Sequence, residues 1–169
     1  MARRPLCRRS RTVGAGQDLD AYLGFPPKPQ ELRSRKIGHV IFNTRDDRPW
    51  SQYFCCMVGA NRDFVRRNPV ATKRALRAIL KGMDICAAEP ERAARAAAQH
   101  NPRARFEDVL QMVKELRYGN WREFSAEDSA RFFALRMRDI GMIKANPQKL
   151  LAQGTDWRFI NELKRELKA

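Results

Sequence analysis

The chain has 169 residues, of which 43% are hydrophobic and 31% are charged, and its formal net charge is +15. This length suits one domain with a real core and is short for two, and the composition excludes a chain that is disordered throughout. No apolar run is long enough to span a membrane, and the basic residues are spread along the chain, which favours charged helix faces over a nucleic-acid-binding tract.

The first residues are strongly basic, with five arginines among residues 1–11. Such charge is typical of the start of a signal peptide, but no apolar run follows it here. Residues 1–17 are therefore expected to form a disordered basic tail. Without a recognisable signal peptide, the chain as written is expected to stay in the cytoplasm.

The four cysteines do not have the spacing of a metal site. No C-x-x-C pair is present, and His39 and His100 stand apart from the cysteines. Cys55 and Cys56 are adjacent, so on a strand their side chains would point to opposite faces. We therefore expect buried free thiols, no bound metal and no cofactor.

Three segments near the start have the pattern of strands or extended chain. Residues 18–25 form a short apolar run that is closed by prolines. Residues 36–43 (KIGHVIFN) are rich in β-branched and aromatic side chains. Residues 53–60 (YFCCMVGA) form a continuous apolar run, as in a strand covered on both faces. The sequence therefore predicts two or three strands within its first 60 residues.

From residue 61 onward the pattern becomes helical. Proline is expected in the first turn of two helices, where its missing N–H costs nothing. Ser125 with Asp128 resembles a capping box, and Gly141 is expected to end the helix that they begin. The expected helices span residues 61–67, 70–87, 90–100, 106–116, 126–140 and 157–167.

This order of elements predicts an incomplete fold. A doubly wound α/β domain alternates strands and helices throughout, whereas here the strands come first and only helices follow. So few strands would leave an apolar sheet edge unpaired. The predicted fold class is therefore α/β and helix-rich, with two or three strands followed by helices and the front half of the fold missing.

One loop carries the best candidate for a binding site. None of the motifs G-x-S-x-G, P-loop, H-E-x-x-H and G-x-G-x-x-G occurs. The arginines beside Asp46 and Asp47 favour salt bridges over acid–base catalysis. A run of two aromatic and two polar residues joins this loop to the third extended segment. Aromatic walls with a few polar groups suit a small planar ligand, although packing in the core is the open alternative. The run comprises Trp50, Ser51, Gln52 and Tyr53.

Three parts of the sequence resemble periplasmic solute-binding proteins of ABC importers, in the class that serves nitrate, sulfonates, taurine and thiamine-pyrimidine precursors. Residues 18–27 (DLDAYLGFPP) are similar to the family's D-A-x-x-x-x-x-P segment. Residues 60–69 (ANRDFVRRNP) are similar to its x-N-x-x-F-x-x-x-x-P signature. The ending, with GMIK at residues 141–144 and TDWRFINEL at residues 155–163, also resembles the family. The resemblance covers about residues 18–169.

The resemblance implies the type II periplasmic-binding-protein fold, in which two α/β lobes close on a ligand. It implies that residues 18–27 are the return crossing between lobes, and that most of the first sheet and the second lobe are absent. Phe25 and Pro26 at this crossing then join the W-S-Q-Y run as expected ligand-binding residues. The implied partners are a small organic solute and the membrane permease of an importer, in the periplasm. The implied role includes no enzymatic activity, no membrane span and only weak binding by this chain alone.

Two other functions remain open. The net charge of +15 suits a basic helical nucleic-acid-binding protein, although no specific nucleic acid is expected as a partner. The family also has an iron-dependent relative, a thiamine-pyrimidine synthase. Its cysteine-rich iron-binding motif aligns with residues 50–54, none of which is a thiol, while Cys55 and Cys56 fall just beyond. Iron chemistry is therefore not expected here.

Overall fold

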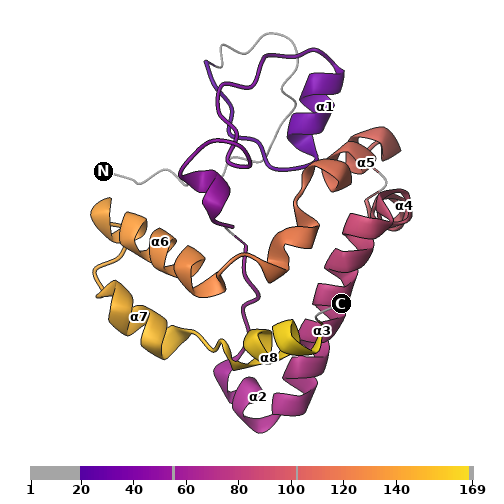
Figure 1. Cartoon of the computed structure of the whole chain (residues 1–169). Helices are drawn as coiled ribbons and strands as arrows, with labels where there is room; N and C mark the ends of the chain where they lie inside the picture. The colour runs from indigo at the N-terminus through magenta and orange to yellow at the C-terminus, as the bar shows by residue number, and fades with distance from the viewer. Residues whose placement is uncertain (1–19, 55, 102, 168–169) are drawn as a thin grey trace.

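The computed structural model describes residues 20–54, 56–101 and 103–167, and the basic tail expected at residues 1–17 lies outside them. All regular structure in the described ranges is helical (Figure 1). The elements are α1 (Lys28–Ser34), η1 (Trp50–Gln52), α2 (Arg62–Arg67), α3 (Pro69–Ala88), α4 (Pro90–His100), α5 (Phe106–Glu115), η2 (Tyr118–Arg122), α6 (Ala126–Asp139), α7 (Pro147–Gly154) and α8 (Arg158–Glu166).

The predicted α/β fold is wrong, because no residue in the described ranges belongs to a strand. The described residues of all three expected strands run instead as turns and irregular chain between helices. A strand is stable only when a neighbouring extended chain exchanges backbone hydrogen bonds with it. Residues 57–60 make no backbone hydrogen bond to any described residue. High β propensity therefore produces no strand here, because the fold supplies no partner for it.

The helices predicted after residue 60 are confirmed, and no boundary differs by more than one residue. Ser125 Oγ accepts a hydrogen bond from the Asp128 N–H at 3.1 Å where α6 begins. Gly141 has a φ of 73° just beyond the end of α6, a conformation that favours glycine. Asp156 accepts a hydrogen bond from the Arg158 N–H where α8 begins.

Two helices, α1 and α7, are not predicted by the sequence pattern. Both carry proline in their first turn. The prolines before α1 indicate the end of an extended segment, but they also fit the start of a helix, because the first turn needs no N–H donors. At α7 the signal is stronger, since Asn146 precedes Pro147 and its side chain accepts a hydrogen bond from the Gln148 N–H at 2.9 Å.

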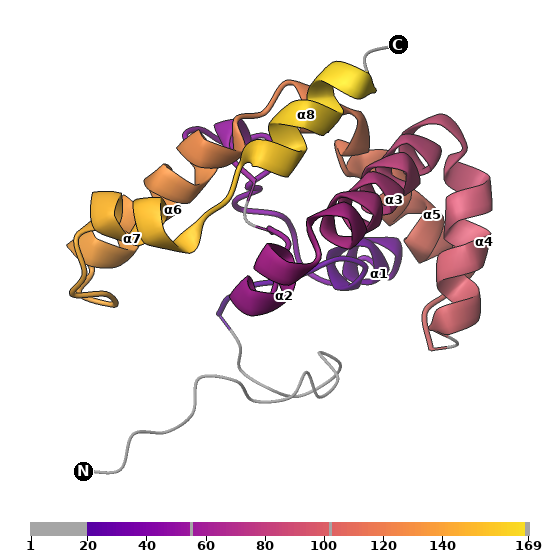
Figure 2. The ribbon, with the colours of Figure 1, turned by 90° about the horizontal axis from the view of Figure 1, so that it is seen from below.

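Helix α3 is the longest element of the described residues, and five other elements, namely α2, α4, α5, η2 and α8, contact it (Figures 1 and 2). Helices α4 and α5 pack on each other beside one end of α3, and α1 packs on α5. Elements η2 and α8 lie against α3, and α6 and α7 pack on each other farther from α3, on the side away from α4. The segment that contains η1 crosses between these two groups of helices.

Two small hydrophobic clusters form the core, one where η2 and α8 meet α3 and one between α4 and α5. Many large apolar side chains stay exposed by contrast, including Ile41 at 76% and Ile140 at 70%. The fold therefore depends on a few buried residues. These are Leu80, Trp121 and Leu163 in the first cluster and Ala94, Val109 and Val113 in the second.

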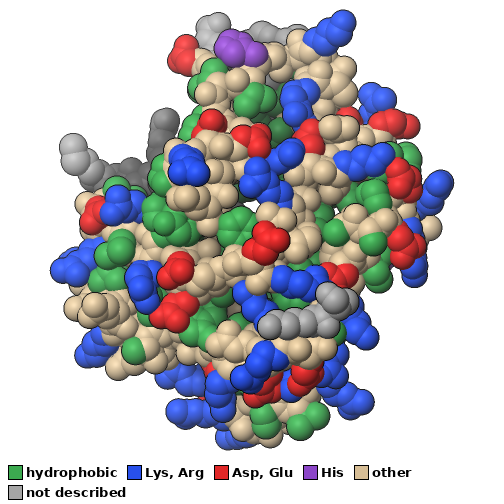
Figure 3. All heavy atoms as spheres, viewed as in Figure 1, with side chains coloured by type: hydrophobic (Ala, Val, Ile, Leu, Met, Phe, Trp, Pro, Cys, Tyr) green, Lys and Arg blue, Asp and Glu red, His purple; other side chains and the backbone are tan. Residues whose placement is uncertain are grey.

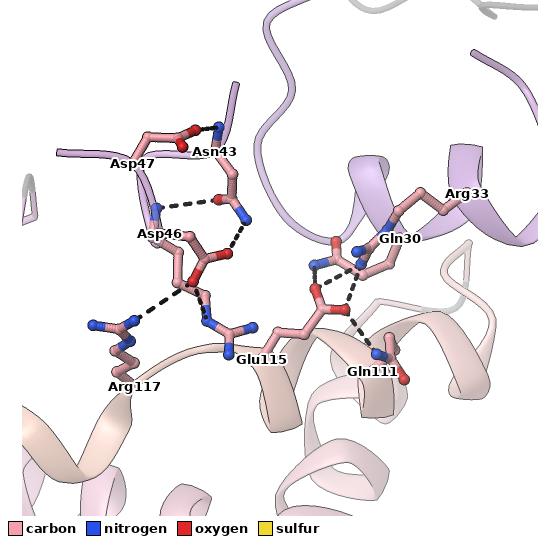
Figure 4. Close-up of polar contacts among 9 residues, drawn as sticks. Gln30, Arg33, Asn43, Asp46, Asp47, Gln111, Glu115 and Arg117 are labelled. Atoms are coloured by element: carbon pink, nitrogen blue, oxygen red, sulfur yellow. Dashed lines mark hydrogen bonds and ion pairs between the residues drawn. The ribbon is translucent and has the colours of Figure 1, made fainter. Parts of the chain in front are cut away.

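A charged contact holds α1 to α5 (Figure 4). Arg33 donates hydrogen bonds to both oxygens of Glu115, at 2.5 and 2.6 Å, and Gln30 donates to one of them at 2.8 Å. Gln111 adds a fourth hydrogen bond at 2.7 Å. Partial burial raises the pKa of Glu115, but these hydrogen bonds outweigh it and keep the pKa below its ordinary value. The carboxylate therefore stays charged. Its pair with Arg33 is the only ion pair among the described residues that joins α1 to another helix.

The loop before η1 is tied to the rest of the chain through Asp46 (Figure 4). Asn43 Nδ2 donates a hydrogen bond to the carboxylate at 2.7 Å, and Arg45 lies 3.5 Å from it. Arg117, which follows α5, also reaches Asp46 at 3.5 Å. Asp46 thus forms salt bridges, one of them with the flanking Arg45, whereas Asp47 accepts a hydrogen bond from the Asn43 N–H at 2.6 Å.

Replacing Ser129 by alanine is expected to stabilise the protein by about 1 kcal/mol, a rise in Tm of about 2–4 °C. Ser129 is 1% exposed, and its hydroxyl has no hydrogen-bond partner among the described residues. Alanine removes this buried polar group and also has the higher helix propensity. Ser125→Ala on the same helix is the matched control, and it should cost about 1 kcal/mol because it removes the N-cap. Thermal unfolding of both variants gives the answer, and a loss of stability in Ser129→Ala would contradict the prediction.

Candidate functional site

The predicted site residues at positions 50–52 form the 3-10 turn η1, which packs on the middle of α6. The Trp50 ring meets the Phe132 ring edge-on, with centroids 5.3 Å apart and planes at 85°. It also lies 6.1 Å from the Phe133 ring. The N–H of Ser51 donates a hydrogen bond to the carbonyl of Asp47, which closes the turn. Trp50 and Ser51 are both half-buried, and Trp50 packs on α6 through its ring contacts.

Tyr53 makes the closest aromatic contact of the site. Its ring is stacked on Phe132, with centroids 4.0 Å apart and planes 10° from parallel. Trp50 and Tyr53 therefore do not face each other across an open slot, since both contact Phe132. Offset-stacked and edge-to-face pairs of this kind contribute about 0.5–1.5 kcal/mol beyond the area that they bury. The same contacts fix the position of Tyr53 beside α6.

A groove of about 490 Å³ lies between the end of η1 and the first half of α6. One side comes from the last residue of η1 and the residue after it, and the other comes from α6 and the short connection that precedes it. Its lining combines three aromatic rings with polar and charged side chains. The lining residues are Gln52, Tyr53, Glu123, Phe124, Ser125, Asp128, Arg131, Phe132 and Leu135.

Some polar groups of the groove already have hydrogen-bond or ion-pair partners within the described ranges, and others do not. Ser125 Oγ already caps α6, and Arg131 is paired with Glu127 at 2.7 Å. Glu123 and Asp128 form no side-chain ion pair or hydrogen bond with any described residue. These two carboxylates, together with the exposed amide of Gln52, are the groups that a ligand in the groove would meet.

The other two predicted site residues lie elsewhere. Phe25 is 69% exposed, and Pro26 is also exposed, two positions before α1 begins. Neither residue lines the groove. Of the six predicted residues, the structure therefore brings together the four of the W-S-Q-Y run and places two of these, Gln52 and Tyr53, in the groove wall.

Sequence reasoning missed the α6 side of the groove. Asp128, Arg131, Phe132 and Leu135 are spaced by three, one and three positions, which places them on one face of a helix. The same pattern also describes an ordinary core-facing helix. The spacing therefore predicts that these four side chains lie on one face of a helix. It does not predict that this face contacts residues 52–53.

Charge on the visible face of the molecule is mixed (Figure 3). Lysine and arginine side chains alternate with aspartate and glutamate over most elements, rather than forming one basic tract. Several basic groups are also paired, as Lys73 is with Glu162 and Glu166 at 2.6 Å each. On this face the basic side chains therefore do not gather into one continuous basic patch.

Among the described residues, no three His, Cys, Asp or Glu side chains are grouped so that they could hold a metal ion. Cys55 lies outside the described residues. No described helix has the length and apolar character needed to cross a membrane.

A groove with aromatic walls and a few polar groups is typical of a protein that binds a small molecule. The family model described as the NMT1-like family matches residues 13–100. The chain belongs to this family, whose members are periplasmic solute-binding proteins, and the match is consistent with the solute-binding component of an ABC transporter. The matched range contains Gln52 and Tyr53 and ends before α5. No curated protein and no solved structure gives a significant match.

Proposed function

We propose that this chain binds a small organic solute in the groove between η1 and α6, and that it serves the permease of an ABC importer in the periplasm. Family membership supports the general role. The main observation in favour of the groove as the binding site is the stacking of Tyr53 on Phe132 at its wall. This contact joins a residue of the matched range to α6 and presents aromatic surface beside free polar groups.

The chemistry of the groove favours binding over catalysis. Ser125, its one hydroxyl-bearing aliphatic side chain, is engaged as the N-cap of α6. Neither histidine lines the groove, so an imidazole base, the commonest activator of a serine nucleophile, is not among its lining residues. We therefore assign the groove a binding role without a chemical step.

Binding by this chain alone is proposed to be weak. Gln52, Glu123, Asp128 and Arg131 are all exposed, so the groove encloses only part of a ligand. Ligands that bind tightly have most of their surface buried, and the loss of their translational freedom is offset by that burial. We propose that this chain supplies one side of a solute-binding cleft and that tight binding needs a second side. The class of importer, whether for sulfonates, taurine or thiamine-pyrimidine precursors, stays a prediction.

Titrating the chain of residues 1–169 with benzamide, a neutral planar amide, tests whether the groove between η1 and α6 is the binding site. We expect saturable binding, with NMR shift changes concentrated at residues 52–53 and in the first half of α6. Tyr53→Ala should weaken binding by about fivefold or more, because it removes an aromatic wall. Tyr22→Ala is the matched control, since Tyr22 is 41% exposed and lies outside the groove. Equal binding by both variants, or shift changes elsewhere, would refute the proposed site.

A further inference from the structure

The groove differs in charge from the chain that carries it. The whole chain has a net charge of +15, yet the groove contains two carboxylates and one guanidinium group. The guanidinium of Arg131 is paired with Glu127, which lies just outside the groove lining. Once that pair is counted as neutral, the negative charges of Glu123 and Asp128 remain.

Two further basic side chains contact lining residues of the groove, and both are already engaged. Lys164 Nζ donates a hydrogen bond to the carbonyl of Phe124 at 2.8 Å, and burial lowers the pKa of this lysine. Arg136 lies over the Phe132 ring at 5.9 Å and is paired with Asp139. No described basic side chain is paired with either groove carboxylate.

The aromatic part of the lining also suits positive charge. A cation over the face of a phenyl or phenol ring is attracted by the electron density of the ring. Arg136 already makes such a contact with Phe132. Tyr53 and Phe124 add further rings to the same lining. The groove therefore offers both interactions that a flat organic cation uses, namely ring faces for its body and carboxylates for its charged end.

We propose that the solute bound in this groove is a small organic cation, an amidinium or ammonium compound with a flat apolar body. The inference rests on the proposed solute-binding function and adds the charge of the ligand to it. The long-range field of the chain acts in the opposite direction, because a net charge of +15 attracts anions and repels cations. A preference for a cation would thus have to come from the groove itself.

Three probes of nearly equal size and shape test the proposal on the full chain: benzamidinium, benzamide and benzoate, each followed by NMR at physiological salt. Benzamidinium should bind about tenfold more tightly than benzamide, the combined effect expected of partly exposed ion pairs and ring contacts. Benzoate should bind more weakly than benzamide. The double variant Glu123→Gln/Asp128→Asn should reduce the preference for benzamidinium over benzamide to about twofold or less.

The matched control is Asp63→Asn/Glu107→Gln, which removes the same charge from two exposed carboxylates outside the groove. This control should keep the tenfold preference, which shows that local and not net charge is responsible. Equal binding of benzamidinium and benzamide would overturn the cation inference and leave solute binding intact, as would tighter binding of benzoate. Binding of none of the three probes at the groove would overturn both the inference and the proposed function.

Discussion

Replacing Leu163 by alanine is expected to cost about 3–5 kcal/mol of folding stability, the range for a fully buried leucine whose site cannot collapse. Leu163 is 0% exposed and packs between α3 and η2, in contact with the cluster of Leu80 and Trp121. Natural domains are stable by only about 5–15 kcal/mol. Because so few apolar residues are buried in this fold, the variant should lose a large part of its stability, and its Tm should fall by about 10 °C or more.

Leu150→Ala is the matched control for this prediction. Leu150 also lies in a helix, α7, but is 43% exposed. Its replacement should cost less than about 1 kcal/mol, since little apolar area returns to water. Urea unfolding of both variants, followed by circular dichroism, measures the difference. Similar losses in the two variants would show that the contacts between α8 and α3 do not stabilise the fold.

Removing the carboxylate of Asp84 is the second change with a large expected effect. Asp84, on α3, accepts a hydrogen bond from Trp121 Nε1 at 2.9 Å and two from Arg122, at 2.6 and 3.0 Å. Trp121 is 7% exposed, so Asp84→Ala leaves its N–H without this partner. The side chain of Asp84 is 35% exposed, and solvent therefore weakens the ion pair. We expect a cost of about 2 kcal/mol at pH 7.

This cost should depend on pH in a defined direction. The hydrogen bonds from Arg122 outweigh the effect of burial and hold the pKa of Asp84 below its ordinary value of 3.8. A lowered carboxyl pKa adds stability that is fully present above the ordinary pKa and is lost as the pH falls through the lowered one. The difference between the parent protein and Asp84→Ala should therefore be largest at neutral pH and shrink in acid.

Asp84→Asn separates charge from hydrogen bonding at this position. Asparagine keeps an oxygen that can accept from Trp121 but has no charge for Arg122, so its cost should be smaller than that of alanine. Stability curves of all three proteins between neutral and acidic pH provide the measurement. A cost of Asp84→Ala that stays the same across this range would show that the charge of Asp84 does not contribute.

Local sequence determined most of the helices after residue 60 and where they begin and end. Ser125 caps α6 with its own hydroxyl, and Gly141 adopts the positive φ that follows its last turn. Such signals act within a few residues, so they can be recognised without knowledge of the fold. The motif at residues 60–69 likewise falls inside the range that the family model matches. Even the missed helix α7 carries a local signal, in Asn146 and Pro147.

Only the tertiary structure decided that the expected strands do not form and which residues line the groove. A strand needs backbone partners from another part of the chain, and residues 57–60 find none among the described residues, whatever their β propensity. The groove depends on contacts across about 80 positions of sequence, between Tyr53 and Phe132. Cys55 and the tail at residues 1–17 lie outside the described ranges, so the expectations for them stay predictions. Helix signals are local, because hydrogen bonds in a helix join residues four apart, whereas pairing of distant segments is set by the packing of the whole chain.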